Sequence, residues 1–157
     1  MNNEITVPHD MISQIRDIMN NARFNVAQQV NNEQLLAYWN IGRVIVEHEQ
    51  DSKERAEYGK QTLKQLSKVL TKEFGKGFSR SNLQNMRAFY LSYPNYQTLS
   101  GKLSWSHYCE LLIISDPERR GFYEKECERS GWSVREMKRQ IATSLFERLL
   151  LSDGKAN

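Results

Sequence analysis

The sequence predicts an all-α protein that folds as one domain over residues 1–157. Apolar residues recur at intervals of three and four along most of the chain, which is the spacing of one face of an α-helix. Only three prolines and eight glycines occur among the 157 residues, which leaves room for long helices. No segment alternates apolar and polar residues as a half-buried β-strand does. A chain of this length can bury a hydrophobic core without disulfides or a metal.

Long helices are expected over residues 8–50. Pro8 is typical of a first helical turn, whereas Asn31 and Asn32 interrupt the pattern and can cap a second helix. The apolar face before the asparagines contains Met11, Ile12, Ile15, Ile18, Met19, Ala22, Val26 and Val30, and the face after them contains Leu35, Leu36, Trp39, Ile41, Val44 and Ile45. The two helices form either an antiparallel hairpin or one bent rod, and the sequence favours neither.

Residues 60–93 are expected to form a helix-turn-helix-like unit. The polar segment 50–59 ends in glycine and is the expected loop before it. Gly75 and Gly77 end the first helix, because glycine tolerates a left-handed C-terminal cap. Ser79 or Ser81 caps the second helix, which ends before Pro94. The apolar face of the first helix contains Leu63, Leu66, Val69, Leu70 and Phe74.

The remaining helices are expected over residues 103–150. Ser104 or Ser106 caps the first of them, and Asp116 before a proline starts the next, which ends near residue 130. Ser133 and Glu136 form a capping-box pair at the start of the last amphipathic helix. The apolar face of that last helix contains Met137, Ile141, Leu145, Phe146 and Leu149.

Basic residues are concentrated in the middle of the chain. Lys60, Lys64, Lys68, Lys72 and Lys76 recur at every fourth position. Residues four apart lie one turn apart on a helix, so the first four lysines form a cationic ridge that winds slowly around it, and Lys76 continues the series. From residue 60 to residue 90, seven basic residues accompany a single acid, whereas the whole chain has a net charge of +3. This local excess indicates a polyanionic partner, of which nucleic acid is the commonest inside cells. Solvated lysines on an ordinary helix surface are the alternative explanation.

The second helix of the unit carries side chains that can contact DNA. In a helix-turn-helix, the N-terminal residues of the second helix enter the major groove. Arginine, asparagine and glutamine, here including Gln84, can bind base edges in pairs of hydrogen bonds, or bind phosphates. The candidate nucleic-acid-binding residues are the ridge lysines Lys60, Lys64, Lys68, Lys72 and Lys76, together with Ser79, Arg80, Asn82, Asn85 and Arg87. Serine and asparagine are also common at helix starts, so this assignment is a hypothesis.

The residues do not form a recognisable catalytic centre, cofactor site or metal site. A metal-dependent nuclease of this kind needs two or more carboxylates and a lysine that converge on a divalent cation. Triplets of a carboxylate, any residue and a lysine begin at Asp51, Glu136 and Asp153, but they are expected by chance when 26% of the residues are charged. No glycine-rich phosphate loop or nucleophile elbow is present, and Cys109 and Cys127 have no metal-ligand spacing. The chain by itself is expected to be non-catalytic and to bind no cofactor.

The sequence also predicts where the protein works. No run approaches about 18 apolar residues, so no membrane span is expected. The N-terminus has neither the basic residues nor the apolar run of an export signal. A cytoplasmic location without membrane partners is therefore the expectation.

Several blocks of the sequence resemble the N-terminal domain of the YhcG-like bacterial proteins. They include residues 38–43, 70–79, 86–90, 103–108 and 131–135, and the resemblance extends over residues 10–150. It implies an all-helical, DNA-binding domain that precedes a C-terminal nuclease domain of the PD-(D/E)xK superfamily. The carboxylates and lysine of that nuclease site are absent from this sequence, so the resemblance transfers no catalytic residue to it.

Two functions from different classes remain open. The first is a module that binds and positions nucleic acid for a nuclease, with DNA as the expected partner, RNA as an alternative, and the nuclease domain of the full-length protein as a further partner. The second is a helical homodimerisation or protein-interaction module, in which the lysines are merely solvated. Met11, Ile15, Ile18, Val44 and Ile45 form two apolar faces that one partner helix does not cover. Both can hold, because dimers of such motifs read two half-sites.

Overall fold

The fold is entirely helical in the residues that the structure describes. The computed structural model describes residues 6–51, 55–99 and 101–155, but not the side chains of residues 55–58, 60, 98, 154 and 155. In chain order the elements are α1 (His9–Gln50), α2 (Arg55–Phe74), α3 (Arg80–Ser92), the 3₁₀ turn η1 (Tyr96–Thr98), α4 (Trp105–Leu111), α5 (Pro117–Ser130), α6 (Val134–Ala142) and α7 (Leu145–Lys155). No strand occurs in these ranges, which confirms the predicted all-α class. Within the same ranges, no helix is both long and apolar enough for a membrane crossing.

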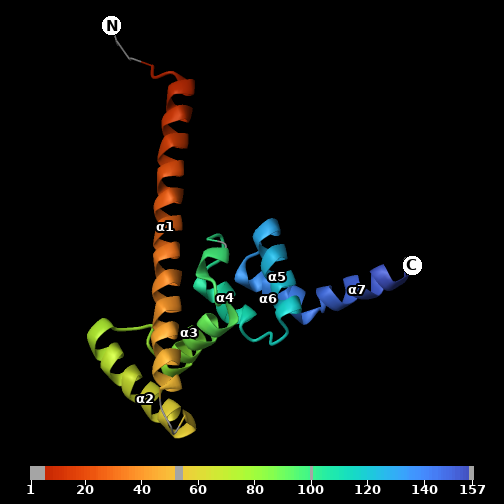
Figure 1. Ribbon diagram of the computed structural model, residues 1–157. Helices are drawn as coiled ribbons and strands as arrows, with labels where there is room; N and C mark the ends of the chain where they lie inside the picture. Colours follow the sequence, from red (N-terminus) through yellow and green to blue (C-terminus); the bar gives the residue numbers. More distant parts are fainter. Residues whose placement is uncertain (1–5, 52–54, 100, 156–157) are drawn as a thin grey trace.

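α1 is one uninterrupted rod, and the other helices gather around its C-terminal half (Figure 1). The predicted interruption at Asn31 and Asn32 is wrong, and of the two arrangements left open the single rod is the one found. The reason is a long-range interaction. The side-chain amide of Asn31 donates to the carbonyl oxygens of Gly101 at 3.3 Å and Leu103 at 2.8 Å. It is therefore bonded to a distant loop, and it does not cap a new helix.

α3 packs directly against α1. Gly42 of α1 is buried, and a Cβ atom there would stand 2.0 Å from the carbonyl oxygen of Met86 in α3. The two backbones therefore approach each other at a distance that only glycine allows. Beside this crossing, the apolar side chains of Ile45, Leu63, Leu83 and Met86 fill the space between α1, α2 and α3.

A second core cluster joins α3 to the C-terminal helices. Phe89 of α3 is fully buried and lies among aromatic rings, with ring centroids 5.2 Å from Trp105 and 5.1 Å from Tyr108. The buried residues of this cluster are Leu35, Phe89, Leu103, Tyr108, Leu111, Ile114, Tyr123, Cys127 and Met137. α3 thus contributes to both clusters and connects the two ends of the core.

The helix starts follow the predicted capping residues. Ser79, and not Ser81, caps α3, since its Oγ accepts a hydrogen bond from the backbone N–H of Asn82 at 3.1 Å. Ser104 caps α4, Asp116 caps α5, and Ser133 caps α6. Each side chain satisfies a backbone donor that the first turn of a helix leaves unpaired.

The last amphipathic helix was expected to be continuous, and it is broken into α6 and α7. Ser144 lies between them with a φ of 57°, a left-handed conformation. The hydroxyl of buried Tyr123 accepts a hydrogen bond from the backbone N–H of Phe146 at 3.2 Å, and Arg119 pairs with Glu147 at 2.7 Å. These contacts with α5 fix the start of α7, which then extends away from α1 (Figure 1).

Candidate nucleic-acid interface

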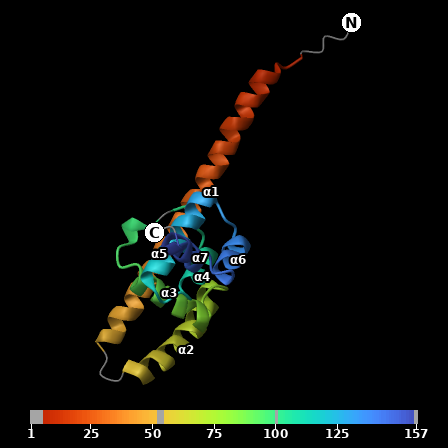
Figure 2. The ribbon, with the colours of Figure 1, turned by 90° about the vertical axis from the view of Figure 1, so that its right-hand side faces the viewer.

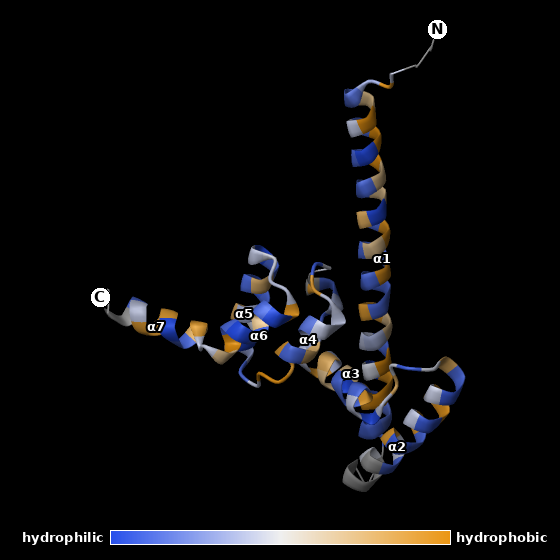
Figure 3. Cartoon of the chain, turned by 180° about the vertical axis from the view of Figure 1, so that it is seen from behind, coloured by the Kyte–Doolittle hydropathy of each residue, from blue (hydrophilic) through white to orange (hydrophobic). Residues whose placement is uncertain are grey.

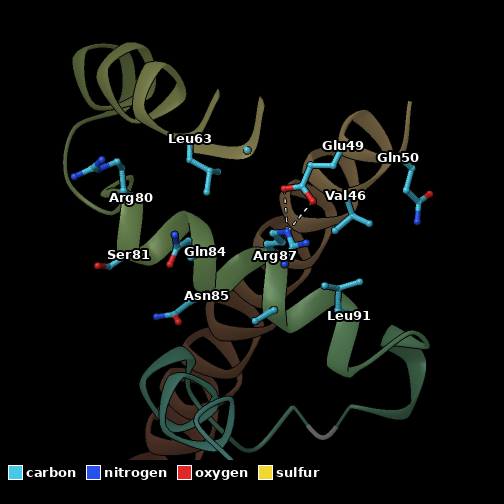
Figure 4. Close-up of a pocket in the computed structure, with 12 residues that line it drawn as sticks. Val46, Glu49, Gln50, Leu63, Arg80, Ser81, Gln84, Asn85, Arg87 and Leu91 are labelled. Atoms are coloured by element: carbon cyan, nitrogen blue, oxygen red, sulfur yellow. Dashed lines mark hydrogen bonds and ion pairs between the residues drawn. The ribbon is translucent and has the colours of Figure 1, made fainter. Parts of the chain in front are cut away.

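A groove of about 1200 Å³ opens between the end of α1, the start of α2 and the polar side of α3 (Figure 4). α3 supplies more than half of the lining residues, and most of those are polar. The groove is lined by Val46, Glu49, Gln50, Gly59, Leu63, Arg80, Ser81, Gln84, Asn85, Arg87, Ala88 and Leu91. It contains three of the residues predicted from sequence, which are Arg80, Asn85 and Arg87.

The polar residues of α3 lie along one side of the helix. Arg80, Gln84 and Arg87 are separated by four and three residues, which is the spacing of one helical face. The buried face is formed by Leu83, Met86 and Phe89, so the packing of α3 against the core turns the polar face toward the groove.

Arg80 is one of the two cationic residues on this face. It is the first residue of α3 and is exposed. Among the residues that the structure describes, it has no ion-pair partner. Its guanidinium stands at a helix N-terminus, where the backbone dipole also favours an anion. Ser79 precedes it and is exposed, but its oxygen already accepts the capping hydrogen bond.

Arg87 is held by an ion pair inside the groove. Its Nε lies 2.9 and 2.8 Å from the two carboxylate oxygens of Glu49, at the end of α1 (Figure 4). The Glu49 side chain is 15% exposed and that of Arg87 is 40% exposed. The carboxylate therefore positions the guanidinium and also competes with any phosphate that approaches it.

The two predicted asparagines have different surroundings. Asn82 lies on the other side of α3 and does not line the groove. Its side-chain oxygen accepts a hydrogen bond from Trp105 Nε1 at 2.8 Å, and its Nδ2 donates to the carbonyl oxygen of Gly77. Asn82 thereby fixes the turn before α3. Asn85 lines the groove and is half-buried, with a 3.6 Å contact from its Nδ2 to the Cys109 sulfur.

Lys64, Lys68 and Lys72 lie on α2 and Lys76 in the turn after it, and none of these four lines the groove. Lys64, Lys68, Lys72 and Lys76 are exposed, and none forms an ion pair with a residue that the structure describes. The side chain of Lys60 lies outside the described part of the structure. On an ideal helix Lys64 stands about 100° from buried Leu63, and Lys68 and Lys72 turn further away from it. The ridge thus runs from beside the groove to the outer side of α2.

Glu49 is a groove residue that sequence reasoning missed. It belongs to α1 and is separated by 38 residues from Arg87, its partner. Taken alone, each of the two residues is an ordinary charged side chain on an exposed helix. No sequence pattern around either residue predicts their ion pair, because only the crossing of α1 and α3 brings the two side chains together.

The described residues show no reactive centre in or near the groove. Burial raises the pKa of the Cys109 thiol to about 11 and that of Cys127 to about 11. Both are therefore protonated at neutral pH, which disfavours nucleophilic chemistry. In the described ranges, no three His, Cys, Asp or Glu side chains are grouped as a metal site.

Comparison with known proteins gives two findings. The family model described as "DUF1016 N-terminal domain" matches residues 14–148. The sequence is also 39% identical to the Escherichia coli (strain K12) protein named "Putative nuclease YhcG", in an alignment that covers 94% of this chain and 47% of that protein. The chain thus spans about half the length of this curated relative. No solved structure matches the chain.

Proposed function

The chain belongs to the family of the DUF1016 N-terminal domain, and from this premise we propose that it binds nucleic acid and positions it for a nuclease in the cytoplasm. DNA is the proposed partner. The relative spans about twice the length that is matched here and carries the name of a nuclease. We accordingly assign the cleavage chemistry to residues other than these 157, and we assign no cofactor to them.

The observation that carries the proposal is the polar face of α3 along the groove. Arg80, Gln84 and Arg87 share that face, and the groove beside it is about 1200 Å³ in volume. Arginine and glutamine are the side chains that bind phosphates and base edges. Nearby, α2 carries exposed lysines without ion-pair partners among the described residues, and these add a phosphate-binding wall.

Each group has a distinct proposed role. α2, the turn after it and α3 act as a helix-turn-helix-like unit. Arg80 and the lysines of α2 bind phosphates, which supplies most of the affinity. Gln84 and Asn85 face base edges, and Arg87 is held by Glu49 until a phosphate competes for it. Ser79 and Asn82 act through the fold, because the first caps α3 and the second fixes the turn.

Binding of labelled duplex DNA across a salt series tests this proposal. Each lost phosphate contact makes the logarithmic salt slope about 0.9 less steep. We therefore expect Arg80→Glu and Lys68→Glu each to weaken binding and to flatten the slope.

Two charge-matched variants serve as controls. Arg135→Glu changes an exposed arginine in the first turn of α6, and Lys125→Glu changes an exposed lysine of α5. Neither lies near the groove, so both should bind as the parent does. Equal binding by all four variants and the parent would contradict the proposal. Competition by structured RNA that exceeds competition by duplex DNA would replace DNA with RNA as the partner.

A further inference from the structure

The N-terminal half of α1 stands clear of the rest of the molecule. In two views at right angles, no other helix lies beside it (Figures 1 and 2). Residues 9–27 are exposed except for half-exposed Ser13. An isolated helix of this length is marginal in water unless an apolar face is covered.

This exposed segment carries a continuous apolar stripe, visible as orange bands along α1 in Figure 3. At 100° per residue, its members all lie within about 60° of Ile15 on a helical wheel. They are Met11, Ile12, Ile15, Ile18, Met19, Ala22, Val26 and Val30. Phe24, the other large apolar residue of the segment, lies about 180° from Ile15.

The stripe faces away from the body of the protein. Leu35 is buried against the core and follows Ile15 by twenty residues, which is about 200° around an ideal helix. The residues of α1 that pack on α3 are thus on the side opposite to the stripe. A partner can cover the stripe without meeting α3 or the C-terminal helices.

The area of the stripe is sufficient for a specific interface. Its seven large side chains are between 41% and 65% exposed. Covering them with a partner helix buries on the order of 500 Å² per copy, or about 1,000 Å² in total, which is the size at which specific interfaces begin.

The charge of the segment disfavours a membrane as the partner. Arg16 and Arg23 are balanced by Asp10 and Asp17, all of them off the stripe. Helices that lie on membranes are rich in basic residues, which anionic lipids attract. The stripe itself contains no charged group through which it could recognise a different protein. A second copy of the chain carries a stripe of equal length, so pairing of two copies covers both stripes in one interface.

We propose that two copies of this chain pair through the outer face of residues 11–30 of α1. Each copy buries the apolar stripe of the other, and the groove and ridge of both copies remain free. This interface is independent of the proposed nucleic-acid binding, since it uses neither α2 nor α3.

Sedimentation of the whole chain at about 50 μM, where a modest dimer is populated, tests this proposal. The parent should sediment as a dimer. Ile15→Glu and Ile18→Glu place a charge in the stripe of both copies, and each should raise the dimer dissociation constant about 100-fold or more. Near-ultraviolet circular dichroism of the buried aromatic rings should stay unchanged, because the core lies elsewhere.

Phe24→Glu is the matched control. Phe24 is 66% exposed and Ile18 is 65% exposed, but they lie on opposite sides of α1. Phe24→Glu should remain dimeric. A monomeric parent overturns the proposal, whether or not it binds lipid vesicles, and so does a dimer that survives both stripe substitutions.

Discussion

Replacing Gly42 by alanine tests whether the close contact between α1 and α3 limits the stability of the fold. The added Cβ would lie 2.0 Å from the carbonyl oxygen of Met86, 2.7 Å from its carbonyl carbon and 3.1 Å from Tyr90 Cβ. Two of these atoms belong to backbone, which cannot rotate away as the end of a side chain can. α3 must therefore move away from α1, and its buried residues must repack.

The magnitude follows from two opposing effects. Overpacking of a close contact costs about 1–3 kcal/mol and occasionally more. Alanine in the interior of a helix regains about 1 kcal/mol relative to glycine. Because backbone atoms meet here, we expect the upper part of the first range, so Gly42→Ala should lower the free energy of unfolding by about 2 kcal/mol.

Urea denaturation followed by far-ultraviolet circular dichroism measures this change, and Gly121→Ala is the control. Gly121 also lies inside a helix, but an added Cβ there meets no atom within 4 Å. Gly121→Ala should therefore stabilise the protein by up to about 1 kcal/mol. If both glycines give the same sign of change, the close approach of α1 and α3 does not limit stability.

Two further predictions concern single carboxylates. Glu49→Gln removes the charge that competes with phosphate for Arg87, so it should tighten DNA binding several-fold and steepen the salt slope by up to about 0.9. Glu47→Gln is its control, since Glu47 pairs with Arg43 at the exposed surface of α1 at 3.1 Å and does not line the groove; equal effects of the two would refute the role of Glu49. For Glu124, burial raises the pKa of the carboxyl, with a smaller contribution from Glu128. A raised pKa means that the folded protein loses stability as the pH rises through it, so Glu124→Gln should gain stability relative to the parent as the pH rises above the ordinary pKa of a glutamate. Urea midpoints of both proteins at several pH values measure this difference, and a constant difference would contradict it.

The sequence correctly predicted features, such as helix caps, that depend on residues close together in the chain. Ser79 and Asp116 cap helices because their side chains reach backbone donors two or three residues away. The same local reasoning failed where a distant group competed. Asn31 bonds to a loop about 70 residues away, and Tyr123 captures the backbone of Phe146, which lies 23 residues later and follows the break between α6 and α7.

For the candidate site, helical spacing predicts which residues of α3 share a face. Arg80 and Arg87 are seven residues apart and share a face, and both line the groove. Asn82 was grouped with them by residue type, although its position turns it toward Trp105. The groove itself depends on the end of α1, and no pattern within residues 60–93 contains that information.

Because α3 has a buried face and an exposed face, effects of substitutions on DNA binding can be separated from their effects on the free energy of unfolding. Leu83, Met86 and Phe89 are fully buried, so changes there alter the core and the groove together. Arg80 and Gln84 are exposed on the opposite side, where substitutions usually change stability by less than about 0.5 kcal/mol. A loss of DNA binding in Arg80→Glu at unchanged unfolding free energy therefore reports on the groove, whereas Gly42→Ala should change both measurements because it displaces the whole helix.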